Sequence, residues 1–411
     1  MTPRVFLGKH LRSLKSSMRR VVAISVDFVN KCLSVVILQT SFSLFQFLNK
    51  GGKKSFDWVI GVEDIASTLY GLDRSIENKF SICLFPNHLY NYQFDLMVRG
   101  KFPVRLHRLL VGAYLFGKFA AKSKGFVYNG SGGYLAINDE REYEFKFLAK
   151  HSRKIVVFFC GSEIRSPKKL ADLCIQNGKD HLAQYQVWQS PWMNSENWED
   201  KLKRRCTVTE RYADQIYSMN ADQASYFTGP TKPYPTLIRD DVFQFNTSKF
   251  ESCGTVRILH APSNPFIKGT QVVRAAIKEL KSLGYKFDYK ELIGVSNEVV
   301  IRELRKSHIV LNEFYAFVPG VFGVEALANC CVVLQSADGH VENDLPLDAN
   351  KAWIVTEAHE IRRNLQRVLD NPDAMKSIAE FGYGWALENC SISRMGKKLN
   401  QDLAYVLNNK S

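Results

Sequence analysis

The last third of the chain alternates short apolar runs with amphipathic runs, and this pattern constrains the fold more than any other feature. Residues 256–261 (VRILHA) are typical of a strand, and residues 271–284 (QVVRAAIKELKSLG) place apolar side chains at helical spacing before a glycine. Further predicted strands cover 286–293, 308–314, 331–335 and 351–355, and further helices cover 297–307, 324–329 and 357–371. This alternation predicts a parallel sheet covered by helices, with ligands bound beyond the carboxyl ends of its strands.

The region 56–227 has the same character, because β-rich runs such as FSICLF and RKIVVFF lead into turns rich in Gly, Asn and Ser. Proline and polar residues concentrate at 228–254, which is the natural linker between two units. We therefore predict an α/β protein with two Rossmann-like domains facing a cleft. The predicted division is a basic, apolar segment at 1–55, an N-terminal Rossmann-like domain at 56–240, a C-terminal Rossmann-like domain at 241–390, and a last helix at 391–411.

Charge and cysteine usage indicate the environment of the protein. The 55 Lys and Arg residues exceed the 41 Asp and Glu residues, and the formal net charge of +14 favours anionic partners. Nine scattered cysteines without C-x-x-C spacing are typical of a reducing cytoplasm. The first twenty residues hold six Lys or Arg and no acid, and the apolar stretch that follows is broken by Asp27 and Lys31. Three alternatives follow for this segment. It packs on the protein itself, it attaches peripherally to an anionic membrane surface on the cytoplasmic side, or it inserts into the membrane.

A helix start directly after the strand at 256–261 is the first candidate binding element. Lys268, Gly269 and Thr270 lie there, so backbone N–H groups and the positive end of the helix would face the cleft beside a lysine. This arrangement suits a diphosphate, although the segment does not match a Walker loop. The alternative is an ordinary helix start with a solvated lysine.

A carboxylate on the next βα turn is the second element. Gly320 and Gly323 precede Glu325, which is expected in the first turn of a helix near the end of the strand at 308–314. A carboxylate there can accept two hydroxyl hydrogen bonds, as from a ribose diol. A phosphate ligand on one turn and a diol ligand on another together describe a nucleotide-sugar site.

The order of the segments RILHAPS, KGT and GVFGVEALA resembles the donor-binding domain of GT-B glycosyltransferases. The similar group is the retaining one that includes bacterial polysaccharide glycosyltransferases and phosphatidylinositol mannosyltransferases, and the likeness covers 256–334 well. It implies that Lys268 contacts the donor diphosphate, that Gly320 allows close approach of the donor, and that Glu325 holds the ribose.

The same resemblance implies further donor contacts, and at one position this sequence differs from the family pattern. Ser263 and Asn264 occupy the loop where such enzymes often carry a phosphate-contacting arginine, and the backbone around Gly294 would border the base. The family often has a second glutamate eight residues before the ribose glutamate, and here that position is Phe317. The departure raises the alternative of a catalytically silent nucleotide or saccharide binder.

Candidate catalytic residues lie in the N-terminal half. The segment GSEIRS at 161–166 is similar to a G-S-D-I-R segment of polysaccharide-assembling members, which implies that Glu163 and Arg165 face the cleft. An ordinary helix N-cap is the alternative. His88 follows a strand and is the best-placed residue for acceptor contact or proton transfer, although a lone histidine is more often structural.

The sequence thus predicts a glycosyltransferase of the hexosyltransferase type. The resemblance implies that the domain at 56–240 binds the acceptor, that the domain at 241–390 binds the nucleotide sugar, and that the helix at 391–411 crosses back to the N-terminal domain. It further implies transfer of a sugar, with retention of configuration, from a nucleotide-sugar donor, UDP-linked, to a lipid-linked or growing saccharide in surface polysaccharide synthesis. No D-x-D pair or His and carboxylate cluster indicates a metal, and no cofactor is expected. A rival of the same fold is a polyol-phosphate transferase using a CDP donor. Nucleic acid is not an expected partner, because no aromatic RNA-binding sheet, zinc motif or recognition helix is visible.

Overall fold

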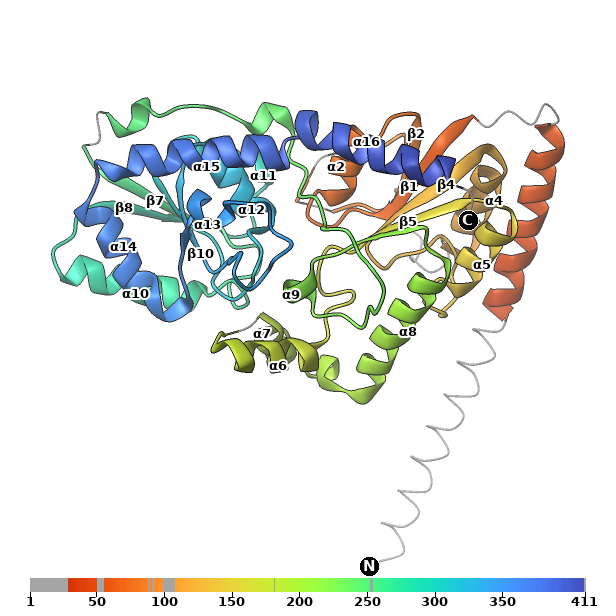
Figure 1. Cartoon of the computed structure of the whole chain (residues 1–411), viewed down its shortest axis with the longest axis horizontal. Coiled ribbons are helices and arrows are strands. Elements are labelled where there is room, and N and C mark those ends of the chain that lie inside the picture. The colour runs from red at the N-terminus through yellow and green to blue at the C-terminus, as the bar shows by residue number, and fades with distance from the viewer. Residues whose placement is uncertain are drawn as a thin grey trace, which may run out of the picture.

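The computed structural model describes residues 29–49, 55–87, 89–90, 92–98, 108–180, 182–251 and 254–409. Two sheets, each made of parallel strands and each covered by helices, lie side by side (Figure 1). The predicted α/β class is therefore confirmed.

The N-terminal sheet has six parallel strands in the order β3-β2-β1-β4-β5-β6. The strands are β1 (Phe56–Glu63), β2 (Lys79–Phe85), β3 (Leu96–Met97), β4 (Ser123–Asn129), β5 (Lys154–Phe158) and β6 (Gln215–Tyr217). Its helices are α2 (Thr68–Ser75), α4 (Ala113–Lys122), α5 (Glu142–Lys150), α6 (Pro167–Asn177), α7 (Leu182–Gln189), α8 (Glu196–Tyr212) and α9 (Asn220–Gln223). The central strands are buried on both faces, as their near-continuous apolar sequences require.

The C-terminal sheet has five parallel strands in the order β11-β10-β9-β7-β8. The strands are β7 (Val256–His260), β8 (Phe287–Glu291), β9 (Ile309–Leu311), β10 (Val332–Gln335) and β11 (Ile354–Val355). The helices are α10 (Thr270–Ser282), α11 (Asn297–Leu304), α12 (Gly320–Leu327), α13 (Ala349–Ala352), α14 (Ile361–Asp370), α15 (Ala374–Cys390) and α16 (Ile392–Asn408). The strand expected at 351–355 is wrong in its first half, because α13 extends to Ala352 and only Ile354 and Val355 pair with β10.

The last helix joins the two halves of the molecule. After α15, α16 runs across to the N-terminal sheet (Figure 1), where Leu399 and Leu403 pack in one apolar cluster with Trp58 and Ile60 of β1. The Asn400 side-chain amide donates a hydrogen bond of 2.7 Å to the Ser75 carbonyl at the end of α2. Helix α16 therefore packs on the N-terminal domain.

A long helix at Val29–Leu48 covers the outer face of α4 and α5, on the side of the N-terminal domain away from the C-terminal domain (Figure 1). It packs closely at Gly117, where an added Cβ would lie 2.0 Å from the Ser41 hydroxyl oxygen and 2.6 Å from the Leu38 carbonyl oxygen. Within the described residues it is the one helix long and apolar enough to cross a membrane.

The basic, aromatic segment that begins at residue 101 is described from residue 108 onward. There α4 buries Leu115, Phe116 and Phe119 against the sheet. This part of the segment covers the sheet, and residues 101–107 lie outside the described residues.

Candidate functional site

Both sheets contribute to one cavity of about 270 Å³ at the domain junction. Its walls include residues that follow five strands: Ile65 after β1, Cys160 after β5, Met219 after β6, Lys268 after β7 and Val318 after β9. The cavity therefore lies beyond the carboxyl ends of both sheets, where ligands bind in open α/β folds.

Lys268 lies in the wall of this cavity and forms an ion pair with Glu313. Glu313 is the second residue after β9 and is buried, and its burial raises the pKa of the carboxyl group against the opposing effect of Lys268. Sequence reasoning missed Glu313, which reads only as the polar end of an apolar strand. The pair holds the lysine ammonium next to the start of α12.

The backbone amides expected to be free for a diphosphate are already engaged, so that part of the sequence interpretation is wrong. The N–H groups of Lys268, Gly269 and Thr270 donate to the carbonyls of residues 264, 266 and 265, at 3.1, 3.4 and 3.0 Å. The Thr270 hydroxyl is buried and lies 2.9 Å from Nε2 of His260. Among these three residues, the Lys268 side chain is the group directed at the cavity.

Ser263 and Asn264 belong to the same loop and differ in their surroundings. Asn264 exchanges two hydrogen bonds with Gln189 of α7, of 2.9 and 3.2 Å, and its Oδ1 also accepts from the Phe266 amide at 3.2 Å. Asn264 thus shapes the loop and ties it to the N-terminal domain. Ser263 is exposed on the loop surface.

Gly320 begins α12 with a φ of +60°, in the left-handed region that glycine tolerates best. A Cβ at this position would lie 3.3 Å from Oε1 of Glu313. Gly294, in the loop after β8, also has a positive φ of +67°, but open space surrounds it. The Glu313 carboxylate therefore limits the room for a side chain at Gly320, and close approach of the donor to this residue stays a prediction.

We expect Gly320→Ala to lower the free energy of unfolding by about 1–2 kcal/mol, because alanine is strained in this conformation and contacts Glu313. Urea denaturation measures the change. Gly384→Ala in α15 is the matched control, because a Cβ there meets nothing within 4 Å and should be neutral or stabilising. Equal effects of both substitutions would contradict the strain assigned to Gly320.

Glu325 lies in the second turn of α12 and not in its first, because the helix begins at Gly320. Its side chain is buried, and Oε1 accepts a 2.9 Å hydrogen bond from the Asn297 amide of α11. Burial raises the pKa of Glu325 to about 7, against the opposing effects of Asn297 and Arg239. Among the described residues, Asn297 of the facing helix α11 is the donor that holds this carboxyl group, and Glu325 lies behind the residues of α12 that line the cavity, Gly320 and Val321.

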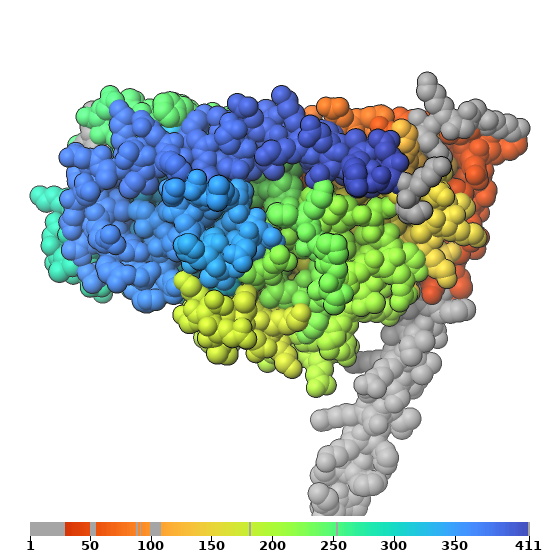
Figure 2. Space-filling model, in the orientation of Figure 1, coloured from red at the N-terminus to blue at the C-terminus, as the bar shows by residue number. Residues whose placement is uncertain are grey.

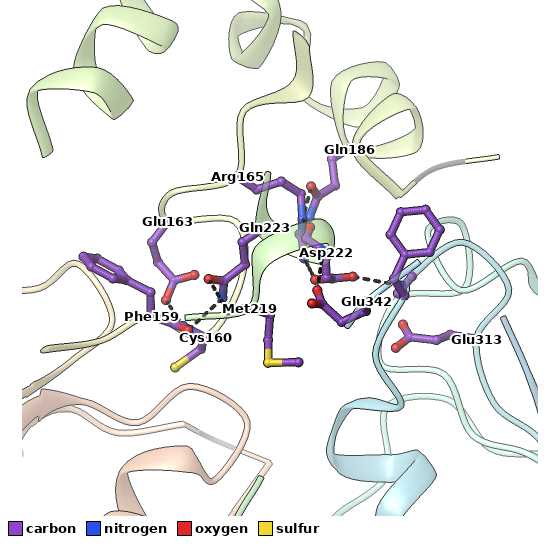
Figure 3. Close-up of polar contacts among 12 residues, drawn as sticks. Phe159, Cys160, Glu163, Arg165, Gln186, Met219, Asp222, Gln223, Glu313 and Glu342 are labelled. Carbon is purple, nitrogen blue, oxygen red and sulfur yellow. Dashed lines mark hydrogen bonds and ion pairs between the residues drawn. The ribbon is translucent and has the colours of Figure 1, made fainter. Parts of the chain in front are cut away.

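Arg165 does not face the cavity as a free cation. Its guanidinium forms an ion pair with Asp222 of α9, donates from Nε to the Asp222 carbonyl at 2.7 Å, and reaches Gln186 at 3.5 Å (Figure 3). Glu163 accepts a 2.9 Å hydrogen bond from the Cys160 amide, which holds the turn after β5. His88, the third predicted catalytic residue, lies outside the described residues.

Asp222 connects the two domains, as Figure 3 shows. Besides Arg165, it accepts a 3.0 Å hydrogen bond from the Phe317 amide of the C-terminal domain. Its own amide donates to Glu342 Oε2 at 2.8 Å. Sequence reasoning missed Asp222 and Glu342, because Asp222 lies in the four-residue helix α9 and Glu342 in the run of turns before α13, and both segments are too short to show a pattern.

Phe317 packs where the resemblance expects a glutamate. Its side chain is buried in an apolar cluster with Leu170 and Cys174 of α6, and with Ala221 of α9. The residue therefore holds the C-terminal domain against the N-terminal one. Three carboxylates, Glu313, Asp222 and Glu342, lie near one another at this junction (Figure 3), and Asp222 accepts from the Phe317 amide.

Glu342 should make the stability of the protein depend on pH. Burial raises the pKa of its carboxyl group to about 7, above the usual value near 4.5, so its contribution to stability is full below about pH 4.5 and is lost as the pH rises toward 7. Glu342→Gln keeps an oxygen that can accept from Asp222. We expect the variant to match the wild type at pH 4.5 and to exceed it by about 2–3 kcal/mol at pH 8.

Unfolding of both proteins in urea across this pH range measures the difference. Glu77→Gln, at an exposed position, is the control and should give the same stability as the wild type throughout. A pH-independent difference between Glu342→Gln and the wild type would contradict the assignment.

Groups of side chains that could bind a metal ion are absent from the described residues. Among these residues, no group of three or more His, Cys, Asp or Glu side chains has an arrangement that could hold an ion.

Comparison with known proteins places the fold. No protein-family model matches the sequence, and no curated protein matches it. Among solved structures, HepE from Anabaena in complex with UDP-glucose is 14% identical and superposes with a TM-score of 0.55, over 85% of this chain and 99% of HepE. Sucrose-phosphate synthase from Thermosynechococcus elongatus is 12% identical with a TM-score of 0.56, over 86% and 99% of the two chains.

A third similar structure is WaaG, a glycosyltransferase involved in lipopolysaccharide biosynthesis. It is 11% identical with a TM-score of 0.51, over 85% of this chain and 99% of WaaG. At such low identities the likeness shows the fold. The chain has the GT-B fold of two Rossmann-like domains, as the sequence predicted.

Proposed function

We propose that the protein is a glycosyltransferase that transfers a sugar from a nucleotide sugar, UDP-linked, to a saccharide acceptor. The observation that carries the proposal is the position of Lys268 in the cavity wall, together with the buried carboxyl group of Glu325 on α12, the helix whose first residue, Gly320, lines the same cavity. A cation suits the donor diphosphate, and a carboxylate suits the ribose hydroxyls. HepE, which has this fold, is in complex with UDP-glucose in its structure, and this favours a UDP-linked donor.

Charge that develops on the departing diphosphate is the chief electrostatic demand of the reaction. In our proposal Lys268 meets it without a metal ion, because the ammonium sits in a partly buried position where a charge acts strongly. Glu313 holds Lys268 in place before the donor arrives and gives up part of the ion pair to the diphosphate. Retention of configuration completes the proposal and follows from the family resemblance.

The proposal is tested by incubating the protein with UDP-, GDP- and CDP-linked sugars and with CDP-glycerol, and by measuring the nucleotide released. We expect slow release from a UDP-sugar, with water as acceptor, and an anomeric configuration that proton NMR shows to be retained. Consumption of CDP-glycerol alone would favour the polyol-phosphate transferase. Binding of UDP-sugars without any turnover would favour the silent binder.

We further propose that the protein attaches to an anionic membrane at its cytoplasmic face through the helix Val29–Leu48. The helix buries one side on α4 and leaves apolar residues on the opposite side. The exposed apolar residues are Val29, Leu33, Val36, Leu44, Phe47 and Leu48. Lys118 and Lys122 of α4 flank the helix, with their ammonium groups 5.7 and 5.2 Å from the Phe45 ring centre. An apolar stripe edged by lysines suits an anionic bilayer and a lipid-linked acceptor.

Flotation with vesicles tests this attachment. The wild type should float with phosphatidylglycerol vesicles at low salt, whereas the double variant Val36→Glu/Phe47→Glu should stay in solution, since both positions are exposed and the fold should tolerate the charges. Leu283→Glu, at an exposed leucine of the C-terminal domain, is the control and should float. Equal flotation of all three proteins, or of none, would contradict the proposed surface.

A further inference from the structure

A second hollow lies outside the cleft, in the N-terminal domain. It is a groove of about 610 Å³ between α6, α7 and α8, and Figure 2 shows α6 and α7 on the surface below the junction of the two domains. Its walls mix polar and apolar side chains, and Trp188 of α7 lines it with 61% of its surface exposed. A large exposed aromatic ring in a groove indicates a binding surface, because burial of that ring would be favourable.

Trp188 is held in position by other aromatic rings. Tyr185 meets it edge-on with ring centres 5.3 Å apart, and Phe266 of the C-terminal domain lies at 6.3 Å. Tyr185 in turn stacks on Tyr315 at 3.8 Å. Residues of both domains therefore fix the indole, which can present a face to a ligand with little loss of conformational entropy.

Helix α7, which forms one wall of the groove, also contacts residues at the domain junction. Helix α7 carries Trp188 to the groove, Gln186 to Arg165 at the domain junction, and Gln189 to Asn264 in the loop that ends with Lys268. Helix α7 thus connects the wall of the groove with the domain junction and with the loop that ends with Lys268.

The charge of the groove restricts the ligand. Four carboxylates line it against two lysines, in a protein whose formal net charge is +14. The carboxylates are Asp172, Glu196, Glu199 and Asp200, and the lysines are Lys168 and Lys203. This local excess of acid disfavours polyanions, including phosphorylated lipids and nucleic acids. Carboxylates and amides do accept hydrogen bonds from hydroxyl groups, and an indole face packs on the C–H face of a pyranose ring.

We propose that this groove binds the non-reacting units of an uncharged saccharide chain, with one sugar ring stacked on Trp188. The inference rests on the proposed function and deepens it, because it makes the acceptor a chain of several neutral sugars. Such binding away from the reacting centre would position the end of the chain at the donor.

The test titrates the full-length protein with maltoheptaose, isomaltoheptaose, cellohexaose, chitohexaose and mannohexaose, and with an anionic hyaluronan hexasaccharide, by calorimetry. We expect at least one neutral chain to bind more tightly than the anionic one. Trp188→Ala should weaken that binding at least tenfold, and Trp188→Phe, which keeps a ring, should retain most of it. Trp192→Ala is the matched control, because Trp192 is equally exposed and lies outside the groove.

Titration of UDP in the same variants separates this inference from the proposed function. Trp188→Ala should bind UDP as the wild type does. Saccharide binding without UDP binding would contradict the proposed donor site and would still support the proposed saccharide groove. The absence of binding by every neutral chain at millimolar concentration, tighter binding of the anionic chain, or equal affinity of wild type and Trp188→Ala would overturn the groove.

Discussion

Replacement of Lys268 by methionine is expected to lower kcat/KM for the nucleotide sugar about 100- to 1,000-fold. The ammonium lies in the cavity wall, where it would meet the charge of the leaving diphosphate, and loss of one such group from a partly buried site has an effect of this size. Initial rates of nucleotide release measure the change. Lys278→Met, at an exposed lysine of α10, is the control and should stay within about twofold of the wild type.

A structural explanation of this loss must be separated from a catalytic one. Lys268→Met leaves Glu313 buried without its cation, so the variant should also lose stability. The double variant Lys268→Met/Glu313→Gln removes both charges and should recover stability without recovering activity. Recovery of both, or wild-type activity of Lys268→Met, would contradict the role of the lysine.

Replacement of Glu325 should abolish turnover of the donor, and the effect should depend on pH. Because the pKa of Glu325 is raised to about 7, the carboxyl group is ionised at pH 8 and protonated at pH 5.5. A carboxylate accepts hydroxyl hydrogen bonds more strongly than a neutral group does. We expect Glu325→Gln to bind UDP at least about tenfold more weakly than the wild type at pH 8, and the two to converge at pH 5.5.

Glu325→Ala should lose donor turnover at every pH, and it also leaves the Asn297 amide without its acceptor. Glu325→Gln retains that hydrogen bond and is the better test of binding. Glu298→Gln, at an exposed position one residue from Asn297, is the control and should bind UDP normally. A pH-independent loss in Glu325→Gln, or no loss, would contradict the ribose assignment.

The fold was largely predictable, because its evidence is local. Runs such as 258–260 and 332–335 are buried on both faces of a parallel sheet and therefore read as mostly apolar stretches. The helices between them keep one apolar face, as in α10 with Val273, Ile277 and Leu280 buried. The boundaries were less secure. α12 begins four residues before its predicted start, and this moves Glu325 into the second turn.

The candidate site was predictable only in part, because its contacts join distant parts of the chain. Lys268 and Glu325 stand out locally, as polar residues at the ends of apolar runs. Asp222 meets Phe317 across 95 positions, and neither carries a signal of that contact in its own segment. The sequence predicts free amides at 268–270, because it does not reveal that the preceding loop turns back and that the carbonyl groups of residues 264–266 accept their hydrogen bonds.

Protection against thermal unfolding by nucleoside diphosphates and their sugars tests the central claim most directly, because it needs no acceptor. UDP and at least one UDP-sugar should raise the Tm of the wild type by a few degrees at saturating concentration, and more than GDP or CDP counterparts do. Lys268→Met/Glu313→Gln and Glu325→Gln at pH 8 should lose this protection. The absence of protection by every nucleoside diphosphate, or equal protection of these variants, would contradict a nucleotide-sugar site in the C-terminal domain.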